Sequence, residues 1–414
     1  MSIWESLRPS SARGAVVVTG MLLAAGHLAA QSPLIQNLNQ NAYVQTNLVS
    51  DLDGVALTTD ANLVNPWGIS ASGGSPLWIS NNGTGTSTLY NGAGTPFPIG
   101  TPLVVTIPAP GGGTSAPTGT VFNGTGKFLV ATGAPGLFLF ATEDGTIAAW
   151  NPTTGAVLKV DRSASGAVYK GLALGANASG PVLYATNFRS GRVEAYDGGF
   201  NQLGPGFVDM FLPPGYAPFG IMTEANHNVI VTYALQDAAK HDDVAGFGHG
   251  FVDEFDPDGT FLRRLISRGA LDSPWGLAMA PTKGFGAFNG ALLVGNFGDG
   301  RINAYNLLST DGDFNFPSFD SARFMDSLRD PDGHPITNLG LWGIRFGNGG
   351  SGGAVTSLYF TAGIPGSVGT LDVLEQHGLF GVLNAGTMSA AAAPAPDAAP
   401  PAMRGRHLPG NGGN

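Results

Sequence analysis

Short apolar stretches separated by polar turns recur along most of this chain. Leu77–Asn91, Leu183–Asp197 and Leu292–Asn306 align with one another without a gap. Each starts with an apolar stretch, passes a polar turn containing Asn and Gly, and continues into a stretch that alternates apolar with polar residues. This pattern predicts three β-hairpins, since side chains alternate between the two faces of a strand.

Three more hairpins fit the same pattern with changes in length. They are Phe138–Asn151 with two residues deleted and, with an insertion between the strands, Val229–Tyr233 with Gly250–Asp256 and Leu358–Ala362 with Gly378–Leu383. A phrase with a central glycine precedes each hairpin, at Asn65–Ile69, Ala116–Val121, Tyr169–Leu174, Ala217–Ile221, Ser273–Leu277 and Leu341–Ile344. Sheets packed radially bury both faces, and circular closure protects their edges. The six units therefore predict an all-β fold, a six-bladed β-propeller over residues 42–386.

The sixth unit ends near Leu383 and lacks an outer strand. Tyr43–Ser50 alternates apolar with polar residues ahead of the first unit, so we expect it to supply that strand and to close the ring. The rings of Trp67, Phe219 and Trp275 recur beside the glycine, and we expect them to pack between neighbouring blades. The alternative is that these rings stack on a cofactor.

Composition agrees with a packed β protein and excludes several functions. The 64 Gly and 29 Pro residues disfavour helices, and 43% hydrophobic against 12% charged residues disfavours disorder. The formal net charge of −10 and the lack of a basic run make nucleic acid an unexpected partner. Without cysteine, the chain has no disulfide and no thiolate metal site.

The two ends differ from the repeats. Arg8 and Arg13 precede the apolar stretch Gly14–Ala30, which is typical of a secretory signal peptide over residues 1–30, with a membrane anchor as the alternative. Residues 387–414 are rich in Ala, Pro and Gly, and we expect a flexible tail. We therefore expect a secreted or periplasmic monomer with no membrane span after cleavage.

One set of polar residues is a candidate cation site. Asn81, Asn187 and Asn296 end the first strand of their hairpins, and we align Glu143 with them in the second unit. Equal register means equal facing, so the four would surround the axis. Their oxygens could bind Ca²⁺ or another divalent cation. The alternative is that Asn is only a turn residue.

Three other groups of polar residues are weaker candidates. The insertion Ala234–Gly250 contains Asp237, His241, Asp242, Asp243 and His249, which form either a metal site or a solvated loop. Glu375 and His377 could serve as acid and base or form a surface pair. Asp311 and Asp313 match half of a calcium loop, without its glycine and its final glutamate.

The phrases also resemble an uncharacterised family of secreted bacterial propeller proteins, some of which carry a Pro-Glu-Pro sorting tail. The matching phrases include NLVNPWGIS, FLFATEDGTIAAWNP, VYKGLAL, SPWGLAMAP, LLVGNFGDGRINAYN and LWGIRFGN, between Tyr43 and Leu383. More distantly, the chain is similar to NHL-repeat and gluconolactonase-type six-bladed propellers. That resemblance implies a central channel, which holds a divalent cation in some members.

The function expected from the sequence is binding. Asparagine recurs at the hairpin position where a metal-dependent enzyme would need several carboxylates, and only Glu143 carries a charge there. We therefore expect an exported, non-catalytic binding or scaffold propeller, with a small molecule, a glycan or a protein as ligand. The alternative is a divalent-metal-dependent hydrolase or lactonase that acts at the channel.

The signal-peptide assignment predicts an exported chain whose N-terminus lies near Gln31. Expression in a bacterial host, cell fractionation and N-terminal sequencing would measure this. Recovery of an uncleaved residue 1–30 segment in the membrane fraction would favour the anchor instead.

Overall fold

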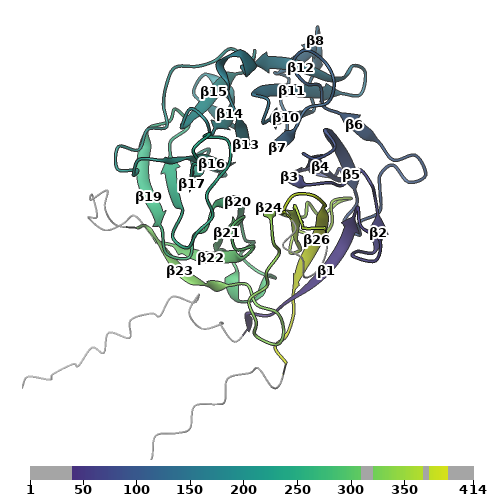
Figure 1. The fold of residues 1–414 in the computed structure, drawn as a ribbon, viewed down its shortest axis with the longest axis vertical. Helices are drawn as coiled ribbons and strands as arrows, with labels where there is room; N and C mark the ends of the chain where they lie inside the picture. The colour runs from purple at the N-terminus through teal and green to yellow at the C-terminus, as the bar shows by residue number, and fades with distance from the viewer. Residues whose placement is uncertain (1–39, 309–319, 367–372, 390–414) are drawn as a thin grey trace, which may run out of the picture.

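A computed structural model describes residues 40–308, 320–366 and 373–389. Six small antiparallel sheets are arranged radially around one axis, which confirms the six-bladed β-propeller (Figure 1). The innermost strands are β3 (Pro66–Ser70), β7 (Pro117–Phe122), β13 (Tyr169–Asn177), β16 (Tyr216–Thr223), β20 (Pro274–Met279) and β24 (Leu341–Phe346). Each contains the glycine of its repeat phrase.

Two further strands per blade form the predicted hairpins. The second strands are β4 (Leu77–Asn81), β10 (Phe138–Thr142), β14 (Gly180–Asn187), β17 (Val229–Leu235), β21 (Leu292–Asn296) and β25 (Leu358–Ala362). The third strands are β5 (Thr86–Tyr90), β11 (Thr146–Asn151), β15 (Arg192–Asp197), β18 (Phe251–Phe255), β22 (Ile302–Leu307) and β26 (Leu379–Ala385). The sequence pattern therefore located both strands of the hairpin in every blade.

The outer strands are less regular. They are β6 (Val104–Thr106), β12 (Gly155–Asp161), β19 (Phe261–Ser267), β23 (Ala322–Ser327) and, in the sixth blade, β1 (Tyr43–Ser50), whereas the third blade has three strands. The remaining elements are β2 (Thr58–Thr59), the hairpin of β8 (Leu129–Ala131) and β9 (Ala134–Pro135), and the 3₁₀ turns η2 (Ser163–Ser165) and η3 (Gly286–Phe288). Within the described residues no helix is long and apolar enough to cross a membrane.

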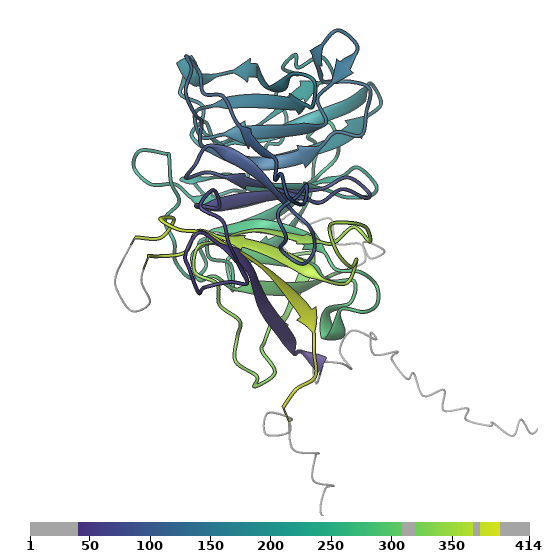
Figure 2. The same ribbon diagram turned by 90° about the vertical axis from the view of Figure 1, so that its right-hand side faces the viewer.

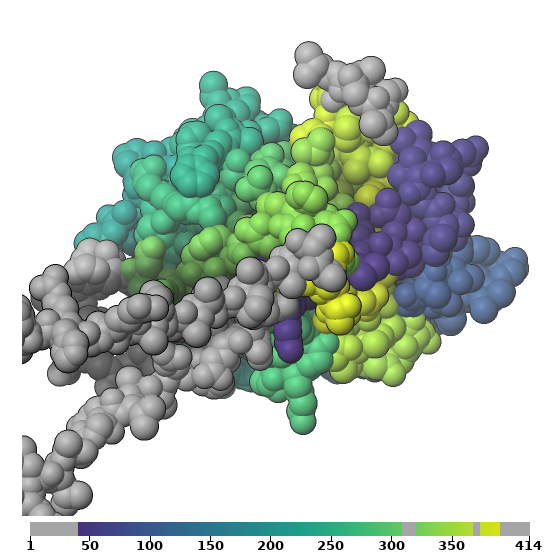
Figure 3. All heavy atoms as spheres, turned by 90° about the horizontal axis from the view of Figure 1, so that it is seen from below, coloured from purple at the N-terminus to yellow at the C-terminus, as the bar shows by residue number. Residues whose placement is uncertain are grey.

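Strand β1 closes the ring, as the sequence predicted. It pairs antiparallel with β26 from Tyr43 opposite Ala385 to Ser50 opposite Leu379, with one bulge near Asn47. Figures 2 and 3 show this N-terminal strand beside the C-terminal strand of the same blade. Because the chain has no cysteine, backbone pairing and side-chain packing make this closure.

Six glycines fix the distance between blades at the axis. We call Gly68, Gly119, Gly171, Gly220, Gly276 and Gly343 the glycine ring. A Cβ atom on any of them would lie no more than 2.9 Å from a backbone atom of the next blade, and the contact of Gly343 with Trp67 completes the circle. A side chain at these positions would push adjacent blades apart, which explains the six-fold recurrence of the phrase.

Threonines connect the same strands from blade to blade. Thr186 accepts a hydrogen bond from the amide of Gly171 and donates one to the carbonyl of Phe219 in the next blade. Thr232 makes the equivalent bonds in the fourth blade and Thr361 in the sixth, where the acceptor is the carbonyl of Trp67. One buried hydroxyl thus satisfies a donor in its own blade and an acceptor in its neighbour.

In four blades the aromatic residue that precedes the ring glycine lies at the axis. Trp67, Phe219, Trp275 and Trp342 form one buried cluster with Phe188 and Phe297, which we call the aromatic plug. Trp275 packs edge-on against both Trp67 and Trp342, with ring centroids 5.8 Å apart in each pair. Trp67 also stacks on Trp342 of the adjacent sixth blade, with ring centroids 3.4 Å apart, so the expected packing of rings between neighbouring blades is confirmed. Trp67 and Trp275 come from non-adjacent blades, so the rings meet across the axis as well. The sequence located the rings but not the axis on which they meet.

Closure by β1 predicts unequal effects along one strand. Tyr43 is fully buried against Phe285 and Phe288 and donates a hydrogen bond to the carbonyl of Phe285. Tyr43→Ala should lower the free energy of unfolding by about 3 to 5 kcal/mol, because it leaves a cavity at the closure. Denaturant unfolding would measure the loss.

Val44→Ala is the matched control, since Val44 is the next residue and 49% of it is exposed. Its effect should stay below about 0.5 kcal/mol. Equal effects of the two variants would show that β1 does not hold the ring closed.

Candidate functional site

The candidate site lies at the axial mouth where the innermost strands begin. The amide of Glu143 donates a hydrogen bond to the carbonyl of Ala116, just ahead of β7. The amide of Asn82 makes the equivalent bond to the carbonyl of Asn65, just ahead of β3. Glu143 and Asn82 therefore occupy the same place in their blades, and the side chain of Asn82 donates a hydrogen bond of 2.9 Å to Glu143.

This register corrects the sequence alignment of the site residues. Asn81, Asn187 and Asn296 do occupy one register position, opposite the first residue of the innermost strand. The residue of the second blade in that position is Thr142, opposite Pro117. The turn after β10 is one residue shorter than the turn after β4, not two, and the error moved Glu143 into the asparagine column.

The three asparagines point into their own blades. Asn81 donates hydrogen bonds to Thr86 and Thr88, and Asn187 donates one to the buried carboxylate of Glu194. Asn296 donates to the carbonyl of Ala270 and to Asp299. Each side chain therefore stabilises a hairpin end, and the structure does not bring the three amides together with Glu143. The geometry favours the turn alternative for the asparagines.

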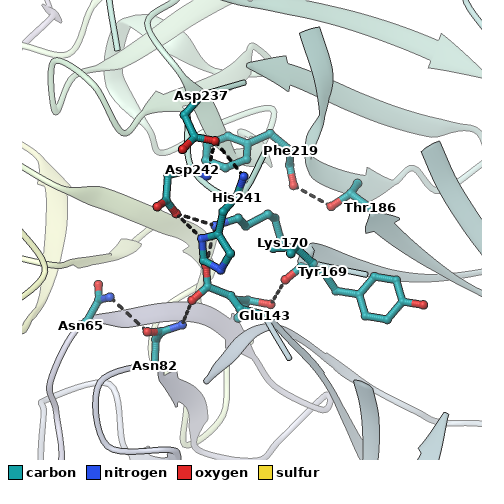
Figure 4. Close-up of polar contacts among 12 residues, drawn as sticks. Asn65, Asn82, Glu143, Tyr169, Lys170, Thr186, Phe219, Asp237, His241 and Asp242 are labelled. Atoms are coloured by element: carbon teal, nitrogen blue, oxygen red, sulfur yellow. Dashed lines mark hydrogen bonds and ion pairs between the residues drawn. The ribbon is translucent and has the colours of Figure 1, made fainter. Parts of the chain in front are cut away.

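Lys170 stands at the centre of the mouth. It precedes ring glycine Gly171, at the position that Trp or Phe occupies in four other blades. Its ammonium lies 2.5 Å from Glu143 and 3.3 Å from Asp242, and only 1% of the residue is exposed (Figure 4). The same nitrogen lies 5.1 Å from the ring centroid of Trp67, within cation–π range.

The surroundings keep Lys170 charged. Burial alone would lower the pKa of the ammonium, but the negative charge of Glu143 and its hydrogen bond outweigh burial, so the pKa lies above its ordinary value. For Asp242, the charge of Lys170 and the contact with His241 outweigh partial burial and lower the pKa of the carboxyl. Lys170 and Asp242 therefore both remain ionised at neutral pH.

The long insertion of the fourth blade brings Asp242 to the axis. It connects β17 to β18, and the carboxylate of Asp237 accepts the backbone amides of His241 and Asp242, which fixes the turn. Nδ1 of His241 lies 2.8 Å from Asp242 (Figure 4). His249 instead contacts the carbonyl of Val244 within the loop. The predicted cluster therefore divides, and only part of it reaches the mouth.

Three of these residues could converge on a metal ion. Glu143, His241 and Asp242 each offer a ligand atom, and these atoms lie within 4.8 Å of one another. The ammonium of Lys170 already contacts two of the three. Carboxylate and imidazole ligands suit several divalent ions, so the ligand chemistry fits, but the protein places its own cation beside them.

Two more acids of the mouth are shifted towards the protonated form. Burial, and then the charge of Glu143, raise the pKa of Glu375 to about 7, although Lys170 opposes this. Burial raises the pKa of Asp243 to about 6, although the charge of Lys170 opposes this. Such shifts often indicate a functional site.

Glu375 and His377 do not act as a pair. Nδ1 of His377 lies 2.6 Å from Asp51, whose other oxygen accepts the amide of Gly378. This contact attaches the segment after β1 to the start of β26. Asp311 and Asp313 lie outside the described residues.

Lys170 is the functional residue that sequence reasoning missed. In the phrase Tyr169–Leu174 a lysine precedes the glycine, where four other phrases have tryptophan or phenylalanine, and this departure was the available signal. A lysine in a column of tryptophan and phenylalanine needs a counter-charge at the axis. The sequence contained both partners, but no spacing rule connects residues 143, 170 and 242.

Comparisons with known proteins place the chain among proteins of unknown function. No family model matches it. It is 34% identical over 311 residues to the uncharacterized protein R648 of Acanthamoeba polyphaga mimivirus, with 72% of each chain covered. It is 33% identical over 277 residues to the uncharacterized protein L690 of the same virus, covering 63% of this chain and 70% of the other. These relatives are viral, so they do not support the secreted bacterial family suggested by the phrases.

Solved propeller structures are distantly similar. A streptogramin B lyase has a TM-score of 0.43 and 13% identity, covering 83% of this chain and 97% of its own. A putative gluconolactonase has a TM-score of 0.39 and 16% identity, covering 61% and 85%. These likenesses concern the fold alone. The sequence match is what decides relationship, and the chain belongs to the same family as the mimivirus protein R648.

Proposed function

We propose that this chain is an exported, non-catalytic binding propeller that holds a small polar ligand at its axial mouth. The observation that carries the proposal is the position of Lys170, whose buried ammonium lies between Glu143 and Asp242. Export rests on the Gly14–Ala30 stretch alone.

The fixed ammonium of Lys170 argues against two kinds of catalysis at this mouth, one that uses a divalent metal ion and one that uses a lysine nucleophile. A divalent ion beside Glu143 and Asp242 would be repelled by Lys170, whose raised pKa keeps it charged. The same charge removes the amine lone pair, so Lys170 is no nucleophile at neutral pH. The mouth therefore offers an ordered, charged surface rather than an activated group.

The ligand should be rich in hydrogen-bond donors. In the described part of the mouth, the four carboxyl groups of Glu143, Asp242, Asp243 and Glu375 surround the one ammonium of Lys170, so oxygens that can accept hydrogen bonds exceed the ammonium donors. Hydroxyl or ammonium groups would satisfy these oxygens, whereas an anion would be repelled. A polyol or a small organic amine has the chemistry that this mouth favours.

The alternative is a metal-dependent hydrolase, favoured by one observation. Glu143, His241 and Asp242 present three ligand atoms within 4.8 Å of one another. An ion could bind there if Lys170 moved aside. The likeness to a putative gluconolactonase structure concerns the fold and does not decide between the two functions.

Calcium binding separates the two functions. Isothermal titration with Ca²⁺ should detect no binding to the parent, because Lys170 already fills the cation position. Lys170→Met should create a site with a Kd of about 10⁻⁴ to 10⁻³ M, typical of sites with few carboxylates. The parent should also show no metal-stimulated hydrolysis in a panel of lactones and esters.

The matched control is the double variant Lys170→Met with Glu143→Gln. It removes the carboxylate closest to the ammonium and should lose the gained Ca²⁺ binding. Stoichiometric Ca²⁺ binding by the parent, with lactone hydrolysis that Glu143→Gln abolishes, would establish the hydrolase and overturn the binding proposal.

The raised pKa of Glu375 predicts a pH-dependent stability. The pKa of Glu375 rises from 4.5 to about 7 in the folded protein, so folding favours the protonated form. Its stabilising effect is complete below about pH 4.5 and is lost as the pH rises through about 7. At pH 8, Glu375→Gln should exceed the parent in unfolding free energy by about 1 to 2 kcal/mol, allowing for partial exposure.

Denaturant unfolding of both proteins between pH 4.5 and 8 would measure this difference. It should shrink to near zero at the acidic end. Asp53→Asn is the control, because Asp53 is exposed and should show no such trend. A constant difference across the range would mean that Glu375 does not titrate as its surroundings imply.

A further inference from the structure

The axis opens into a cavity on the other side of the aromatic plug. The cavity has a volume of about 450 Å³ and is lined by residues of all six innermost strands, from the glycine ring to the strand ends near Ala71, Phe122 and Phe346. Lys170 lies at the start of these strands, and the cavity lies towards their ends. Trp275 belongs to the plug and also lines the cavity, so the plug forms its floor.

The lining combines apolar side chains with backbone groups, a few hydroxyls and one charged side chain. Side chains such as Ile69, Leu172, Ile221, Leu277 and Ile344 contribute to the wall. The volume lies within the range of about 300 to 1,000 Å³ found for small-molecule sites. These apolar side chains suit the hydrocarbon part of a ligand.

Arg345 is the charged side chain in this lining. It lies on β24, and its Nη2 donates a hydrogen bond of 3.2 Å to the carbonyl of Ala71 in the first blade. Its Nε is buried and has no hydrogen-bond partner. Within the described residues no carboxylate forms an ion pair with it.

The buried guanidinium of Arg345 therefore lacks a compensating negative charge. Burial lowers the pKa of Arg345, and no neighbouring acid offsets that effect. Lys170 shows the opposite arrangement, because Glu143 compensates its burial. An anion bound in the cavity would stabilise the charged form of Arg345, as Glu143 stabilises the charged form of Lys170.

We propose that the cavity binds a small organic monocarboxylate with an apolar body, held through its carboxylate by Arg345. The planar guanidinium fork matches a carboxylate and leaves the hydrocarbon chain against the apolar side chains of the wall. A doubly charged phosphate is disfavoured, since the lining has a single cation. The site is separate from the axial mouth, so it does not rest on the proposed function.

Titration of the full-length protein with octanoate and its uncharged analogue octanamide tests the proposal. Isothermal titration should show octanoate binding at least ten times more tightly than octanamide. Arg345→Met keeps an apolar side chain of similar length and should weaken octanoate at least tenfold while leaving octanamide unchanged. Arg192→Gln, at an exposed hairpin position, is the control and should bind octanoate like the parent.

Met279 provides a second pair of variants that leaves Arg345 intact. It lines the cavity and 37% of it is exposed, so a charged side chain can be accommodated. Met279→Glu should weaken octanoate at least threefold by repulsion, and Met279→Lys should not weaken it. This pair decides the question if Arg345→Met fails to fold.

Equal affinity for octanoate and octanamide would overturn the proposal. So would unchanged octanoate binding in Arg345→Met, or in Met279→Glu if Arg345→Met is unfolded. Absence of octanoate and octanamide binding by the parent would also overturn the proposal. Arg345 would then have a structural role only, through its hydrogen bond to the carbonyl of Ala71.

Discussion

The contact of six glycines with the backbone of the next blade is the constraint on which this structure depends. Each ring glycine lies so close to its neighbour that a Cβ atom would collide with it, and the sixth contact returns to the first blade. The spacing of the blades at the axis follows from these contacts, because no side chain separates them there. In five blades the residue before the glycine, which is aromatic in four and Lys170 in the third, then lies at the axis.

That position explains how the fold produces the site. Three blades place tryptophan before the glycine and one places phenylalanine, which fills the axis with the aromatic plug. The third blade places Lys170 there, and burial of an ammonium requires a counter-charge. Glu143 and Asp242 supply it from the second and fourth blades, on either side of Lys170. A lysine in place of an aromatic residue in one repeat thus accounts for the positions of Glu143 and Asp242 at this mouth.

The sequence predicted the repeated part of the fold and missed what the repeat does not encode. Hairpins, ring glycines and the closing strand β1 follow from alternation and recurrence, which are local properties. The misplacement of Glu143 came from a turn that is one residue shorter than its counterparts. The meeting of Lys170 with Asp242 depends on how a long insertion folds over the axis, and alternation says nothing about such a loop.

The two ends of the axis differ in charge, because Lys170 lies at one end and Arg345 at the other. Lys170 is balanced within the protein, so its mouth has excess carboxylates and favours hydrogen-bond donors. Arg345 is balanced by no acid in the described part of the chain, so its cavity favours an anion. The plug residues Trp67, Trp275 and Trp342 are each at most 8% exposed, and they block passage between the ends. A charged ligand at one end therefore cannot reach the other through the axis, and each end can change its chemistry independently while the glycine ring holds the blades in place.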